Sequence, residues 1–147
     1  MNINLYPEFT FFMRLIVTNA TGEAFFVVQD LGGFSQKFVI RDLQLFIYNG
    51  NAEVLVTALP FNVFTNIIIR KQIYQSGAAT ETHIFLTYLD GVAQTSVVSL
   101  IQVNNNQTNI RIVENINHQF GAKIMGFVRQ DISATEVASL NTAMGSL

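Results

Sequence analysis

The chain has 147 residues, of which 50% are hydrophobic and only 12% are charged. An average soluble domain is about 25% charged, so this chain carries an unusual deficit of charge. Eight basic and ten acidic residues give a formal net charge of −2, which argues against a nucleic-acid-binding face and against docking on anionic lipid. The absence of cysteine excludes disulfides, zinc–thiolate sites and thiol nucleophiles. At this length the simplest organisation is one domain with a sizeable core.

The first residues carry neither the basic region nor the long apolar run of a secretory signal. The most hydrophobic stretch, residues 9–17, is too short to cross a bilayer and contains Arg14. We therefore predict no signal peptide, no transmembrane segment and no membrane insertion. The expected location is a virion, with the cytoplasm as the alternative.

Residues 9–18 give the first clear strand pattern. One face of this strand is wholly apolar, because Phe9, Phe11, Met13, Leu15 and Val17 alternate with their neighbours. The other face is also partly apolar, since it carries Phe12 and Ile16. Shorter strands are expected at residues 24–29 and 37–40.

Two hairpins follow along the chain. Residues 44–48 and 51–57 flank Asn49-Gly50, and residues 83–89 and the run from Val92 flank Asp90-Gly91. Type I′ turns need positive φ at both central residues, which Asn-Gly and Asp-Gly provide at little cost. We predict a two-residue turn at both places.

Further strands are expected at residues 63–74, 95–103, 109–114 and 122–129. The strand at 63–74 again has apolar residues on its second face, Phe64 and Ile68. About eight to ten short strands with turns every 8–12 residues predict an all-β, single-domain β-sandwich of jelly-roll-like form. The strand order, and with it the choice between sandwich and barrel, stays open.

The carboxyl end changes character. Ser133 and Glu136 have the spacing of a capping box, and Val137, Leu140 and Met144 recur at helical intervals. We predict a short helix at about residues 134–143. The domain would then consist of a β-sandwich body at 1–132 and a helix or tail at 133–147, which packs on the body or on a neighbouring subunit.

No constellation in the sequence indicates catalysis, and we predict no catalytic residue, no cofactor, no metal ligand and no enzyme activity. Glu81 and His83 share a side of a strand but lack a third ligand, so an exposed ion pair is the better expectation. His118 lies in a polar connection without a partner nucleophile. Residues 30–34 lack the lysine and the helix of a phosphate loop.

The apolar second faces favour assembly, since the outer face of an isolated sandwich is expected to be polar. We predict a structural self-assembling subunit, most simply a small viral or phage virion protein (capsid, vertex or accessory) that binds copies of itself and other structural proteins. In its general architecture the predicted sandwich is similar to single-jelly-roll coat subunits. The alternative is a ligand- or glycan-binding sandwich or barrel. The expected interface consists of Phe12, Ile16, Phe64, Ile68, Val137, Leu140 and Met144.

Overall fold

A computed structural model describes residues 4–5, 8–29, 36–76, 80–102, 108–109, 111–114, 120–128 and 130–147, and the surroundings of side chains within 8–23, 37–73, 82–99, 121–128 and 130–147. The elements in chain order are β1 (Asn4–Leu5), β2 (Phe9–Val17), β3 (Glu23–Gln29), β4 (Gln36–Arg41), β5 (Gln44–Tyr48), β6 (Glu53–Ala58), β7 (Thr65–Ser76), β8 (Thr80–Leu89), β9 (Val92–Ala93), β10 (Val97–Gln102), β11 (Thr108–Asn109), β12 (Arg111–Glu114), β13 (Phe120–Val128) and α1 (Ala134–Gly145). Within these ranges no helix has the length and apolarity to cross a membrane.

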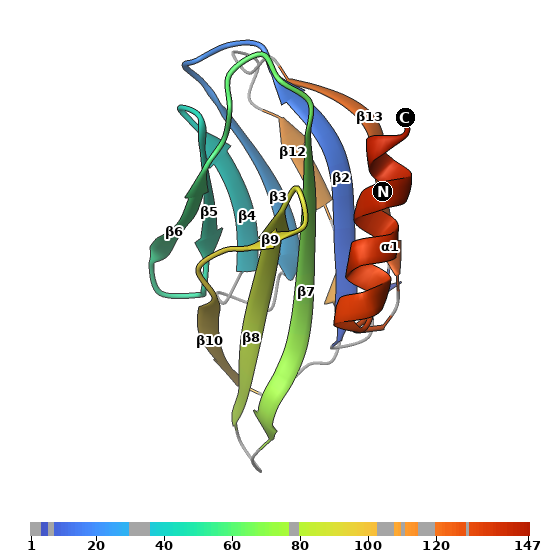
Figure 1. The fold of residues 1–147 in the computed structure, drawn as a ribbon. Coiled ribbons are helices and arrows are strands. Elements are labelled where there is room, and N and C mark those ends of the chain that lie inside the picture. The colour runs from blue at the N-terminus through green and yellow to red at the C-terminus, as the bar shows by residue number, and fades with distance from the viewer. Residues whose placement is uncertain are drawn as a thin grey trace.

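Two antiparallel sheets face each other (Figure 1). One has the strand order β10-β8-β7-β2-β13, with β9 beside β8, and the other has the order β12-β3-β4-β5-β6. A short pair, β1 with β11, accompanies them. This architecture confirms the predicted all-β sandwich with one short C-terminal helix.

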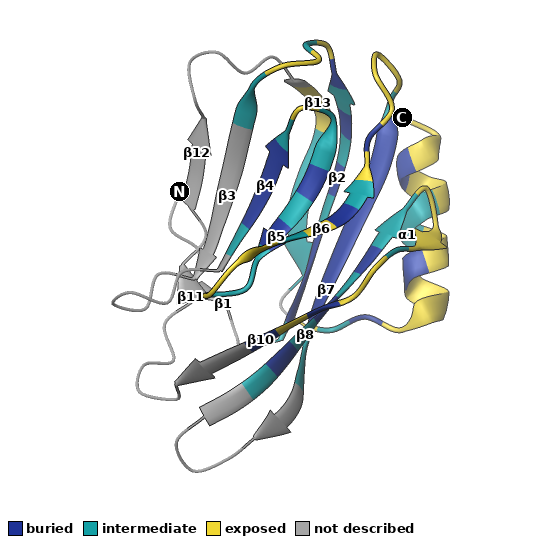
Figure 2. Cartoon of the chain, turned by 90° about the vertical axis from the view of Figure 1, so that its left-hand side faces the viewer, coloured by how far each residue is buried: buried dark blue, intermediate teal, exposed yellow. Residues whose placement is uncertain are grey.

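The core lies between the two sheets. The five alternating residues of β2, from Phe9 to Val17, all point inward as predicted and are buried. They pack against the inner residues of β4 and β5, which appear in dark blue in Figure 2. Phe38 connects the layers, because its ring lies 5.6 Å from the Phe11 ring and 5.8 Å from the Phe85 ring. Aromatic pairs at these distances stabilise the contact beyond the area they bury.

The two predicted hairpin turns have different outcomes. Asp90 and Gly91 have φ values of 48° and 83° between the paired residues Leu89 and Val92, which confirms the two-residue turn. At the first hairpin that prediction is wrong, because Tyr48 pairs with Glu53 and residues 49–52 form a longer loop. The side chain of Asn49 accepts the N–H groups of residues 51 and 52 at 3.1 and 3.0 Å. This local hydrogen bonding, typical of asparagine in turns, lengthens the loop.

A third tight turn, between β4 and β5, has no glycine in its sequence. Asp42 and Leu43 adopt φ values of 48° and 61° between the paired residues Arg41 and Gln44. A left-handed leucine costs roughly 1–2 kcal/mol. Leu43 packs against the core, and its carbonyl accepts the N–H of Leu59 at 2.7 Å. These contacts hold the strained residue in place.

Helix α1 begins with the predicted capping box. The Ser133 hydroxyl accepts the N–H of Glu136, and the Glu136 carboxylate accepts the N–H of Ser133 at 2.7 Å. The helix lies on the outer face of the larger sheet, against β2 and β7 (Figure 1). Val137 and Met144 are buried there with Ile68 and Ile132. The segment 133–147 therefore packs on the body of its own chain.

Candidate binding surface

Helix α1 covers the second apolar face that the sequence assigns to a neighbouring subunit. Five of the seven predicted interface residues lie in this contact within one chain: Phe12, Ile68, Val137, Leu140 and Met144. Gly126 of β13 makes room for one of them, because a Cβ atom at this position would lie 2.6 Å from the Phe12 ring. Three of them, Ile68, Val137 and Met144, are fully buried without a second chain. The other two predicted interface residues, Ile16 and Phe64, belong to neither of the two buried clusters.

Phe64 lies beyond the C-terminal end of α1, between two cations. The Arg14 guanidinium carbon is 5.5 Å from the ring centroid, and the Lys123 Nζ is 4.6 Å from it. Each contact has the geometry of a cation–π interaction, which contributes about 0.5–1 kcal/mol at an exposed site. Lys123 reaches this place through a β-bulge, because the pairing of β13 with β2 skips it between Ala122 and Ile124. A bulge redirects the side chain of its extra residue.

A hydrogen-bond network centred on Asn66 joins the elements around Phe64. The Asn66 side chain accepts from Arg14 Nη1 at 2.8 Å and donates to the carbonyl and side-chain oxygens of Asn141 in α1. Its main-chain N–H donates to Asp90 Oδ1 at 2.9 Å. Lys123 Nζ donates to the main-chain carbonyl of Leu147 at 2.7 Å. Strand β2, the β8–β9 turn and the end of α1 are thereby fixed together.

Exposed apolar side chains lie on the segments that this network connects. The large hydrophobic residues with exposed side chains in the described ranges include four on these segments. Their exposed fractions are 52% for Phe61, 54% for Val63, 64% for Val92 and 54% for Leu147. Phe61 forms a bridge to Val17 at the end of β2. Figure 1 shows the β6–β7 connection and the end of α1 at the same end of the molecule. We call the surface formed by Phe61, Val63, Phe64, Val92, Lys123 and Leu147 the end surface.

Ile16 lies on the outer face of β2, opposite Gly121 of β13. A Cβ atom added to Gly121 would lie 3.3 Å from the Ile16 Cγ2 methyl group. Ile16 is half-buried and lies two residues beyond Arg14 on the same face of the strand. Ile16 and Phe64 are thus the two predicted interface residues that remain outside the contact with α1. The sequence pattern identifies these two, but not the cations beside Phe64.

A second polar cluster anchors the connection into α1. Arg70 forms a bidentate ion pair with Asp131, at 2.7 and 2.8 Å, and donates to the Tyr88 hydroxyl at 3.2 Å. The hydrogen bonds to Asp131 raise the pKa of Arg70 above its ordinary value. Nearby, the Thr10 hydroxyl accepts a hydrogen bond from the Ile132 N–H at 3.2 Å. These interactions fix the connection between β13 and α1 to the sheet. The polar groups of the cluster are occupied by one another and do not form an exposed ligand site.

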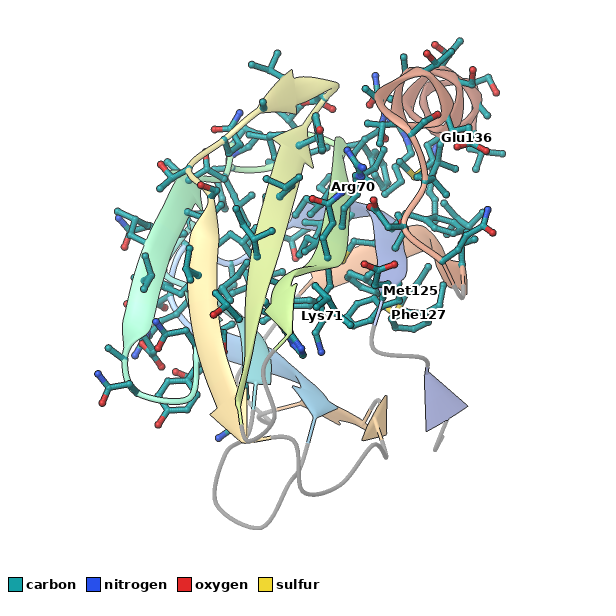
Figure 3. The ribbon with its side chains drawn as sticks, turned by 90° about the horizontal axis from the view of Figure 1, so that it is seen from below. Arg70, Lys71, Met125, Phe127 and Glu136 are labelled. Carbon is teal, nitrogen blue, oxygen red and sulfur yellow. The ribbon has the colours of Figure 1, made fainter. Side chains whose placement is uncertain are left out.

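Lys71, the neighbour of Arg70, points to the opposite face of β7, because successive side chains of a strand alternate between its faces (Figure 3). Its Nζ lies 5.5 Å from the Phe9 ring centroid, inside the sandwich. His83 is also buried there, opposite Ser99 of β10. The prediction of an exposed ion pair at His83 is wrong, because strand alternation places this residue on the inner face of β8 together with Phe85.

The remaining chemical candidates lie only partly within the described residues. The side chains that the structure describes contain no group of three residues that could hold a metal. The Glu81 side chain, His118 and residues 30–34 lie outside the described part of the chain.

No protein-family model matches the chain, and no curated protein is similar to it in sequence. Solved structures do resemble its fold. The binding domain of botulinum neurotoxin serotype D gives a TM-score of 0.62 at 12% identity, over 95% of this chain and 37% of that one. A galectin from Caenorhabditis elegans gives 0.54 at 13% identity, over 87% of this chain and 89% of the galectin.

A structure of botulinum neurotoxin type C, whose cell entry is described as dependent on two ganglioside molecules, gives a TM-score of 0.61 at 7% identity. It is matched over 96% of this chain and 36% of its own length. The chain thus spans little more than a third of the toxin structures that it resembles. At these identities the likeness establishes a shared β-sandwich fold and nothing about the site.

Proposed function

We propose that the chain is a structural subunit that assembles through protein–protein contacts made by its end surface. The observation that carries the proposal is the exposure of four large apolar side chains of the end surface, Phe61, Val63, Val92 and Leu147. Exposed apolar side chains that cluster on one surface are typical of a protein–protein contact. The cations at its edge are typical of interface rims, where charge selects the partner.

The setting that suits this role is a virion, in which copies of the chain contact one another and other structural proteins. No enzyme activity is part of the proposal.

Mass in solution tests the assembly. Light scattering over a concentration series is expected to show particles heavier than the 16.4-kDa chain, and electron microscopy to show rings, shells or other regular objects. Val63→Ser should shift the mass towards the monomer, because it removes an apolar contact from the end surface. Leu55→Ser is the matched control, since Leu55 is also exposed but lies on β6. A monomer at every concentration would contradict the proposal.

Glycan binding is a second candidate. It is supported by the fold shared with a galectin and with a toxin described by its ganglioside interaction. The Arg14 and Lys123 side chains beside Phe64 could bind an acidic sugar, since both cations attract a carboxylate.

Titration with sialyllactose, with lactose as the neutral control, distinguishes the two candidates. Glycan binding predicts chemical-shift changes or heat with sialyllactose that Lys123→Glu abolishes. An unchanged spectrum with both sugars would leave protein contacts as the function of this surface.

A further inference from the structure

Three charged side chains in or beside the end surface, Arg14, Asp90 and Lys123, are not paired with one another. Arg14 and Lys123 make no ion pair with an acidic side chain in the described ranges, where the ion pairs belong to Arg41 and Arg70. Asp90 is exposed and likewise makes no ion pair there. Its carboxylate accepts a hydrogen bond from the Asn66 main-chain N–H, while the Asn66 side chain accepts one from the Arg14 guanidinium. Asn66 therefore holds the two opposite charges apart.

The apolar residues divide in the same way. Val92 follows Asp90 on the β8–β9 hairpin, so the hairpin presents a carboxylate beside an exposed aliphatic side chain. On the other side of Asn66, Lys123 lies beside Phe64 and Leu147. The β8–β9 hairpin therefore contributes an acidic and apolar side, and the region of Phe64 and Lys123 contributes a basic and apolar side.

A surface of this kind complements a second copy of itself. In a two-fold symmetric contact every residue pair occurs twice, because the same surface of each copy faces the other copy. We infer that two copies of the chain meet through the end surface, with the β8–β9 hairpin of each copy against Phe64 and Lys123 of the other. This inference rests on the proposed function and adds the partner, the symmetry and the charge pairing.

Cross-linking tests this contact directly, because the chain has no cysteine of its own. The experiment mixes a Val92→Cys variant with a Val63→Cys variant under mild oxidation. A disulfide forms only when the two Cα atoms come within about 7 Å. The mixture should give several-fold more linked dimer than either variant alone.

Two equally exposed positions outside the end surface serve as controls. Leu55→Cys lies on β6 and Val98→Cys on β10. Neither should link efficiently to Val92→Cys. Equal linking by all pairs would mean random collision and would overturn the inference.

The charge pairing has its own measurement. Lys123→Glu should weaken dimerisation by about tenfold or more, because it faces Asp90 of the second copy with a like charge. Asp90→Asn should weaken it less, since asparagine tolerates the turn and keeps an acceptor for Asn66. The free energy of unfolding of each variant, measured at low concentration, shows that the fold is intact.

The outcomes separate the inference from the proposed function. If Val63→Ser shifts the mass towards the monomer but neither the cysteine pair nor the charge variants respond, the end surface makes its contacts in another arrangement and only the inference fails. If the chain stays monomeric, whether or not sialyllactose or another protein binds the end surface, both fail.

Discussion

At the scale of single residues, Gly126 is a position where the structure tolerates little change. A Cβ there would lie 2.6 Å from Phe12 Cζ, and the Phe12 ring has little room to move because it is packed beneath α1. We expect Gly126→Ala to lower the free energy of unfolding by about 1–3 kcal/mol, the usual cost of overpacking. Denaturant unfolding followed by circular dichroism measures this.

Gly145 is the matched control for Gly126. Its position in the last turn of α1 leaves 3.9 Å between an added methyl group and Asn66 Nδ2, an ordinary contact distance. Alanine favours a helix over glycine by about 1 kcal/mol at most. Gly145→Ala should therefore leave stability unchanged or raise it slightly. A loss as large as that of Gly126→Ala would contradict the steric explanation.

Glu136 makes stability depend on pH. The Ser133 main-chain N–H, and then its hydroxyl, hold the pKa of this carboxyl below its ordinary value of 4.5. A lowered pKa stabilises the folded chain fully above the unfolded-state pKa, and the contribution is lost as the pH falls through the folded-state pKa.

We expect Glu136→Gln to be less stable than the parent above about pH 5 and to approach it in acid. Unfolding curves at a series of pH values measure the difference. If the free energies of unfolding of the two proteins differ by the same amount at all pH values, the carboxylate charge has no part in capping α1.

At the scale of elements, α1 is held by its buried face. Met144 and Val137 are buried against Ile68 of β7. Met144→Ala should cost about 2–5 kcal/mol, because it removes packed atoms and leaves a cavity. Thr142→Ala, on the exposed side of the helix, should have little effect. Equal effects would mean that the helix is not seated on the sheet in solution.

Leu140 distinguishes a helix that belongs to the core from one that clasps a neighbour. It is half-buried at the edge of the contact between α1 and the sheet. Because that contact lies within the chain, Leu140→Asp should lower the melting temperature of the monomer. An unchanged monomer together with lost assembly would place Leu140 against a second chain, as the apolar pattern of the sequence suggests.

The features that can be predicted from the sequence are those that neighbouring residues determine. The alternation of β2, the turn at Asp90-Gly91 and the capping box at Ser133 each depend on a few consecutive residues. The longer loop at Asn49 escapes prediction because the asparagine side chain overrides the usual two-residue turn. The turn at Asp42-Leu43 escapes it because core contacts, and not turn residues, stabilise it.

The candidate surface depends on residues far apart in the chain. Arg14 and Asn66 are 52 positions apart, and Arg70 and Asp131 are 61 apart. Only the strand order brings them together, and periodicity does not give that order. The apolar second faces of β2 and β7 are visible in the sequence, and so is the apolar stripe of α1. Which of them cover each other cannot be deduced from the pattern alone.

At the scale of the whole molecule, β2 pairs with β7 and β13, strands that follow it at long distances along the chain. Such non-local pairing slows folding, because long loops must close before the contacts form. We therefore expect both apolar faces of β2 to be exposed to water early in folding. The outer face becomes covered only when α1 packs on the sheet. Exposed faces of this kind promote aggregation of folding intermediates. We therefore expect the docking of α1 on β2 and β7 to protect the folding chain from aggregation.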